Sequence, residues 1–175
     1  MEEILNSLLR WPIVEAYFRA YSWAWPLNEV LHFMGLVLLV GIIGMFDLRV
    51  MGAFKSVPVK ALQRLLPWSV FGFALASFTG LLFATGVYAN ISIPTGTVIL
   101  NDGYLQLKLV FYFLAGLNLL VFYRTGMARA VENLGAGEDA PPLAKTIAGA
   151  SLVFWLAVVY FGRLIPWGQF SPPGQ

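Results

Sequence analysis

The sequence predicts an all-α integral membrane protein, a four-helix bundle preceded by an amphipathic helix that lies in the membrane interface. The 175 residues are 59% hydrophobic and only 11% charged, with a mean hydropathy of +0.75, whereas a soluble domain carries about 25% charged residues. Four continuous apolar runs are each long enough to cross a hydrocarbon core of about 30 Å as a helix. This composition excludes a water-soluble globular enzyme. The aromatic content of 15% also excludes a disordered chain.

The first element, over residues 1–24, is the amphipathic segment. Its apolar side chains recur at spacings of three and four, whereas Glu3, Arg10 and Arg19 fall largely on the other face. Pro12 breaks the segment or begins a new helix within it. We expect this segment to lie on the outer membrane surface.

The four-helix domain covers residues 25–167 and is followed by a short outer tail at 168–175. The predicted transmembrane helices span residues 27–46, 68–89, 105–123 and 143–165. A short surface helix is expected between Val57 and Leu66, and the Gly- and Pro-rich segment Glu132–Pro142 is expected to be a flexible turn. Small residues at every fourth position from Gly72 to Ala84 favour close helix approach, either inside the bundle or between copies of the chain.

The orientation follows from the basic residues. Seven of them lie after the first and third spans or at the start of the fourth: Arg49, Lys55, Lys60, Arg64, Arg124, Arg129 and Lys145. Only Arg10 and Arg19 are counted on the other side. The positive-inside rule therefore predicts cytoplasmic loops after spans one and three, with both termini facing outward.

Composition also restricts the chemistry. The net charge of +2 gives no electrostatic footprint for nucleic acid. The chain has no cysteine, which excludes disulfides, thiolate metal sites, iron–sulfur clusters and cysteine nucleophiles. His32 is the single histidine, so one copy of the chain cannot build a metal site from several histidines. No motif supports catalysis by this chain alone.

Ionisable groups inside a membrane are costly, so each is a candidate functional residue. Four of them fall near the outer ends of three different spans: Glu29, His32, Lys108 and Arg163. Two further polar side chains share faces with them: Asn118 follows Lys108 on the third span, and Tyr160 precedes Arg163 on the fourth.

Three interpretations compete for these residues. In the first, the cluster is structural: Glu29 pairs with Lys108 or Arg163 and His32 completes the network. In the second, His32 is an axial metal ligand to a b-type haem, whose propionates Lys108 and Arg163 neutralise. In the third, Glu29, His32 and Asn118 line a pathway for a proton, an ion or a quinone.

Several local motifs carry a resemblance. His32-Phe33-Met34-Gly35 and the later Asp47-Leu48-Arg49, together with Pro67-Trp68, Lys108, Asn118 and Gly162-Arg163, resemble the landmarks of a bacterial family of small four-helix membrane proteins. That family is known mainly as a domain of unknown function. The resemblance covers about residues 25–167 and implies a bacterial inner membrane location. More distantly, the plan is similar to copper-resistance D-type and cytochrome b-like membrane proteins, which commonly use more than one intramembrane histidine.

These observations lead to the following functional hypotheses. The first is a small membrane subunit that binds a redox cofactor, haem b or quinone, near its outer face and passes electrons to a partner. The second is a non-catalytic structural or assembly subunit, and the third is an ion or small-solute pathway. In each case the chain is expected to contact the lipid bilayer and to act as a homo-oligomer or as a subunit of a membrane complex.

Overall fold

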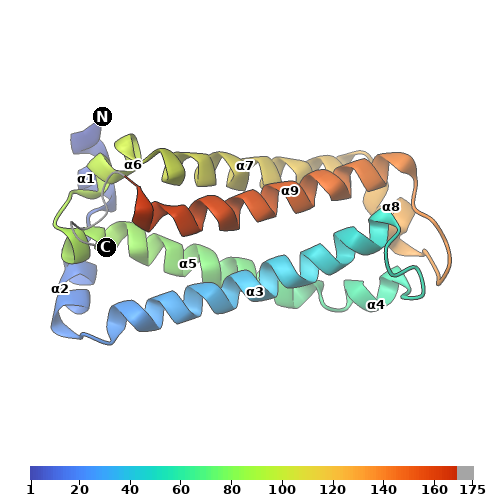
Figure 1. Cartoon of the computed structure of the whole chain (residues 1–175), viewed down its shortest axis with the longest axis horizontal. Coiled ribbons are helices and arrows are strands. Elements are labelled where there is room, and N and C mark those ends of the chain that lie inside the picture. Colours follow the sequence, from blue (N-terminus) through green and yellow to red (C-terminus); the bar gives the residue numbers. More distant parts are fainter. Residues whose placement is uncertain (169–175) are drawn as a thin grey trace.

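The computed structural model describes residues 1–168, which form helices and connecting turns without a β-strand among them. Four helices are long and apolar enough to span a membrane: α3 (Ala24–Met51), α5 (Leu66–Ile91), α7 (Gly103–Arg124) and α9 (Pro142–Leu164). They run side by side along the long axis of the molecule (Figure 1). The predicted all-α four-helix architecture is confirmed, and the chain is a multi-pass membrane protein. Apart from Gly168, the predicted outer tail lies outside the described residues.

Short helices occupy the two ends of the bundle. The end that we call the α6 end carries α1 (Glu2–Leu9), α2 (Pro12–Ala20) and α6 (Thr95–Asn101), and α1 and α2 lie across it (Figure 1). The opposite end, the α8 end, carries α4 (Val59–Gln63) and α8 (Met127–Glu132). The sequence predicted α4 and a helix break at Pro12, but the stretch that forms α6 was expected to be a loop.

The helix α3 extends beyond the first predicted span because the polar residues at its end remain helical. The first span was expected to end at residue 46, yet α3 continues through Asp47 and Arg49 to Met51. Gly52 then ends the helix in the left-handed conformation, with φ of 106°, which glycine adopts without steric cost. The buried positions of Asp47 and Arg49 explain the extension, since both side chains face the packed α8 end rather than water.

Close contact between α3 and α5 depends on two glycines. A Cβ atom at Gly35 would lie 2.7 Å from the Ala76 nitrogen, and one at Gly72 would lie 2.7 Å from the Gly35 carbonyl oxygen. The two backbones therefore touch where side chains would otherwise separate them. Gly72 and Ala76 belong to the small-residue stripe. They serve close helix approach inside the bundle, which is one of the two roles predicted for the stripe, the other being contact between copies of the chain.

The four long helices do not contact one another equally. α3 packs against α5 and α9, and α7 packs against α9. By contrast, α5 and α7 meet mainly through aromatic side chains. The Phe73 ring stacks on Tyr112 with centroids 5.6 Å apart, and the Ser77 and Tyr112 hydroxyls share a hydrogen bond of 3.0 Å. Side-chain contacts, rather than close approach of the backbones, therefore join α5 to α7.

A buried arginine organises the α8 end. Arg49 is fully buried and donates to the carbonyl oxygens of Val57 at 2.5 Å, Gly135 at 2.8 Å and Glu138 at 3.3 Å. The Gly137 backbone N–H also donates to the carbonyl of Lys55 at 2.8 Å. The segment predicted to be a flexible turn, residues 132–142, is therefore tied to α3 and to the loop before α4. Its Gly and Pro content could not reveal these long-range bonds.

Candidate functional site

The centre of the candidate site is the contact between His32 on α3 and Thr79 on α5. The His32 Nδ1 and Thr79 Oγ1 atoms lie 2.9 Å apart. The Thr79 hydroxyl also donates to the Leu75 carbonyl oxygen at 2.7 Å, one turn earlier in α5. A hydroxyl has only one hydrogen to donate, so the Thr79 oxygen accepts the hydrogen bond from Nδ1–H of His32. This arrangement leaves the Nε2 lone pair of a neutral imidazole available to a ligand.

Neighbouring residues hold the imidazole in this orientation. The Asn28 side chain, one turn before His32, donates to the Thr79 carbonyl oxygen at 3.1 Å, so two residues of α3 bind the same residue of α5. The His32 ring lies edge-on to Phe83, with centroids 5.6 Å apart. A Cβ atom at Gly80 would lie 3.4 Å from the His32 Cε1 atom, so this glycine leaves room for the ring. Partners that fix the tautomer and ring orientation are typical of a histidine that serves as a ligand.

Lys108 on α7 is the charged residue associated with this site. Its side chain lies against the α9 backbone, where a Cβ atom at Gly162 would be 3.4 Å from Lys108 Nζ. Within residues 1–168, Lys108 has no ion pair. The structure thus gives an oriented histidine between α3 and α5, and a half-buried cation on α7 that has no counter-ion among the described residues.

The other predicted residues do not join this pair. Glu29, Tyr160 and Arg163 are exposed on the bundle surface, and the ion pairs of the described residues do not connect Glu29 to Lys108 or Arg163. The suggested Glu29 ion pair is therefore wrong for a single copy of the chain. Glu29 and Arg163 do not pair because both side chains lie on exposed faces of their helices. Two side chains at the same membrane depth can still point away from each other.

Asn118 has a local structural partner. Its side-chain amide donates to the Ile147 carbonyl oxygen at 3.1 Å and so connects α7 to α9. This hydrogen bond gives Asn118 the interhelical partner that a polar residue in the middle of a membrane helix needs. Asn118 does not bond to His32 or Lys108.

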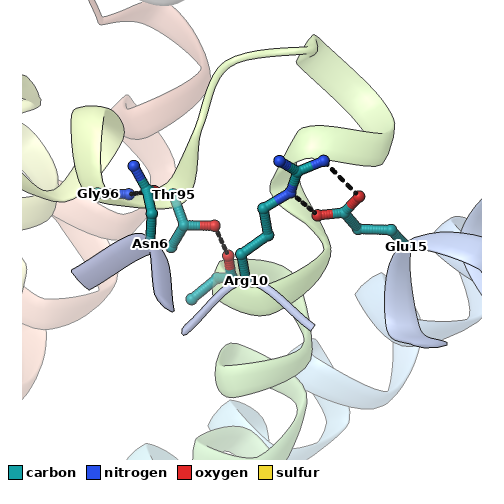
Figure 2. A network of polar contacts seen from close by, with 6 residues as sticks. Asn6, Arg10, Glu15, Thr95 and Gly96 are labelled. Atoms are coloured by element: carbon teal, nitrogen blue, oxygen red, sulfur yellow. Dashed lines mark hydrogen bonds and ion pairs between the residues drawn. The ribbon is translucent and has the colours of Figure 1, made fainter. Parts of the chain in front are cut away.

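Residues not anticipated from the sequence connect the amphipathic segment to the α6 end. Asn6 accepts a hydrogen bond from the Gly96 backbone N–H at 2.7 Å, and the Thr95 hydroxyl donates to the Ala84 carbonyl oxygen at 2.8 Å (Figure 2). Glu2 accepts a further hydrogen bond from Thr97. These contacts link α1 to α6 and α6 to α5, and so close the α6 end near the site.

An ion pair secures α2 at the same end. Arg10 Nε donates to Glu15 at 2.8 Å and Arg10 Nη2 donates at 3.3 Å (Figure 2), while the guanidinium lies 4.0 Å from the Tyr88 ring centroid. The hydrogen bond to Glu15 raises the pKa of Arg10 above its ordinary value. Glu15 is buried although it falls on an amphipathic helix. Its position five residues after Arg10 is the only sequence signal for this pair.

Comparison of the chain with protein-family models, with curated proteins and with solved structures gave no match.

Proposed function

We propose that this chain is a membrane subunit that binds a quinone-type redox ligand between α3 and α7, near the α6 end, and exchanges electrons with a partner protein. The observation that carries the proposal is the presence of two ionisable groups within the spans, an imidazole oriented by Thr79 and the cation of Lys108, which has no ion pair among residues 1–168. Intramembrane ionisable groups of this kind mark ligand or proton sites more often than ordinary surface positions do.

The two residues complement the chemistry of a quinone. A quinone supplies the redox chemistry when bound, taking up two electrons and two protons to become a quinol. Lys108 can donate a hydrogen bond to a ring oxygen and offset negative charge on it. The Nε2 atom of His32 can accept the proton that a quinol hydroxyl releases. The electrons pass to or from a one-electron carrier on the partner protein.

The packing supports access for such a ligand. Quinones are dissolved in the bilayer, and the α5–α7 side of the bundle is joined mainly by side chains around Tyr112. Half-buried His32 and Lys108 both lie in the half of their helix that is nearer the α6 end. We infer that the ligand enters laterally from lipid rather than from water.

A b-type haem is the second candidate, since the unused Nε2 atom of His32 suits axial ligation. The chain offers no second histidine as the opposite ligand. Arg163, expected to neutralise a propionate, lies on an exposed face. The residues of one copy therefore suit a quinone better than a haem.

The proposed location is the bacterial inner membrane, with the α6 end and both termini on the periplasmic side. The basic residues at the α8 end support this orientation, and the resemblance to small four-helix bacterial membrane proteins supports the same membrane.

The test is to quantify bound quinone in the protein purified into lipid nanodiscs and to compare matched variants. His32→Asn keeps an amide donor near the position of Nδ1, and so can keep the Thr79 bond, but it lacks Nε2. Lys108→Met removes the charge at similar length. We expect each variant to retain about tenfold less quinone, whereas Met34→Leu, an exposed position on the same helix, should retain the wild-type amount.

Air-oxidised and reduced visible spectra of the same samples distinguish the alternatives. Sharp reduced bands that disappear in His32→Asn would replace the quinone proposal with a haem. Folded variants with unchanged quinone content and featureless spectra would overturn both and leave the polar residues with a structural role.

A further inference from the structure

We infer that a second site, at the α8 end, binds the headgroup of an anionic phospholipid. An open pocket of about 600 Å³ lies there between α4–α5 and α7–α8. Its polar lining comes from Gln63, Tyr123, Arg124, Arg129 and Glu132, and Leu66 contributes an apolar wall. None of these residues belongs to the His32 site, and the inference is independent of the quinone proposal.

The charges of the pocket are not used by the protein itself. Among residues 1–168, the ion pairs are Arg10–Glu15, Lys55–Asp139 and Lys145–Asp139, so Arg124 and Arg129 have no carboxylate partner. Two guanidinium groups and the Glu132 carboxylate leave the pocket with a net charge of +1. This charge matches a phosphodiester, which carries one negative charge. The planar guanidinium also suits paired hydrogen bonds to phosphate oxygens.

The position of the pocket favours a lipid over a soluble phosphate. Arg124 is the last residue of the membrane span Gly103–Arg124. Leu120, Leu117 and Phe113 precede it at helical spacing on the same face of α7. These side chains are 49%, 55% and 72% exposed, so an apolar stripe extends from the arginine toward the bilayer middle. A phosphate bound at Arg124 would place acyl chains along that stripe. Basic pockets between transmembrane helices at the cytoplasmic boundary are typical sites for anionic lipid headgroups.

The remaining polar groups specify the rest of the headgroup. Glu132 can accept hydrogen bonds from hydroxyl groups, and the Gln63 amide can both donate and accept. A glycerol headgroup presents such hydroxyls beside its phosphate. We therefore assign phosphatidylglycerol-type lipids as the ligand class, rather than phosphatidylethanolamine, whose ammonium group would cancel the charge of its own phosphate.

Native mass spectrometry of the full chain, titrated separately with phosphatidylglycerol, phosphatidylethanolamine and inorganic phosphate, tests this inference. Arg124→Gln combined with Arg129→Gln should bind phosphatidylglycerol about tenfold more weakly. The matched control is Lys60→Gln combined with Arg64→Gln, which removes the same charge from exposed positions of the same end outside the pocket. This control should bind like the wild type. If the double variant does not fold, the single variant Arg129→Gln, at an exposed position of α8, tests the same pocket.

The Glu132→Gln variant discriminates between headgroups. Removal of the carboxylate should leave phosphatidylglycerol binding unchanged or stronger, because it raises the positive charge of the pocket. A loss of phosphatidylethanolamine binding in this variant, with that lipid preferred in the wild type, would overturn the assignment. If phosphatidylglycerol binding weakens equally in the two double variants, the binding follows from the overall surface charge of this end and not from the pocket, and the inference is overturned. Displacement of the lipid by inorganic phosphate at a similar concentration would show a phosphate site without lipid specificity.

Discussion

The helix α3 carries two polar residues that occupy contrasting environments, His32 near the α6 end and Arg49 near the α8 end. Arg49 is fully buried and donates to three backbone carbonyl oxygens from two loops. His32 is half-buried, and the side-chain hydrogen bond that orients it runs from Nδ1 to Thr79. Arg49 connects α3 to three fixed backbone carbonyl groups and so holds the fold together, although its Nη1 atom has no hydrogen-bond partner among the described residues. The half-buried imidazole of His32 is held by a side chain of a single neighbouring helix, which is compatible with a ligand-binding role. The comparison separates a structural residue from a candidate site residue on the same helix.

The largest expected effect is at Arg49. Arg49→Met leaves the carbonyl oxygens of Val57, Gly135 and Glu138 without their buried donor, and each unsatisfied group costs about 1–3 kcal/mol. We expect the free energy of unfolding to fall by about 3 kcal/mol, measured by detergent-induced unfolding followed by circular dichroism. Arg64→Met, an exposed position, should change it by less than about 0.5 kcal/mol. A similar small change for Arg49→Met would contradict its structural role.

An intermediate effect is expected at the α3–α5 contact that positions His32. Gly35→Ala introduces a Cβ atom 2.7 Å from the Ala76 backbone nitrogen, so the helices must separate, at about 1–3 kcal/mol of stability. The separation should also lengthen the His32–Thr79 hydrogen bond and lower quinone retention in the nanodisc assay. Gly41→Ala is the control, because nothing lies within 4 Å of its Cβ position and alanine favours a helix by up to about 1 kcal/mol. If Gly35→Ala is as stable as the control, the backbone contact does not limit the packing.

The smallest expected effect is at Asp139, an exposed residue near the Arg49 loops. Hydrogen bonds from Lys145 and Lys55 lower the pKa of Asp139 below its ordinary value. Because the pKa of Asp139 is lower in the folded state, the unfolded state binds the proton more readily. The ion pairs of Asp139 therefore stabilise the fold above about pH 4, the ordinary pKa of an aspartate. This stabilisation is lost as the pH falls through the pKa of Asp139 in the folded state. Asp139→Asn should remove this acid-dependent part of the unfolding curve. An identical pH profile in wild type and variant would show that these surface pairs contribute nothing measurable.

Sequence analysis predicted the membrane helices well because the bilayer imposes a minimum apolar length on each span. It also identified His32 and Lys108, since ionisable residues inside apolar runs are rare. It did not assign Thr79 or Asn28 to the site, and it expected Gly80 to serve helix approach rather than to leave room for the His32 ring. These residues are common in membrane helices and acquire their role only where α5 meets α3. Similarly, no local pattern predicts that the Arg49 guanidinium reaches the carbonyl groups of Gly135 and Glu138.

The sequence by itself determined the architecture of this protein, because hydrophobic length and charge distribution are properties of each segment alone. Only the tertiary structure decided which polar groups meet. Glu29, His32, Lys108 and Arg163 lie at similar predicted depths, but a helix places side chains all around its axis, and depth does not specify direction. Helix packing turned His32 toward Thr79 and left Glu29 and Arg163 exposed. The same packing buried Arg49 among loop carbonyls, so the roles of the polar residues follow from contacts between segments far apart in the chain.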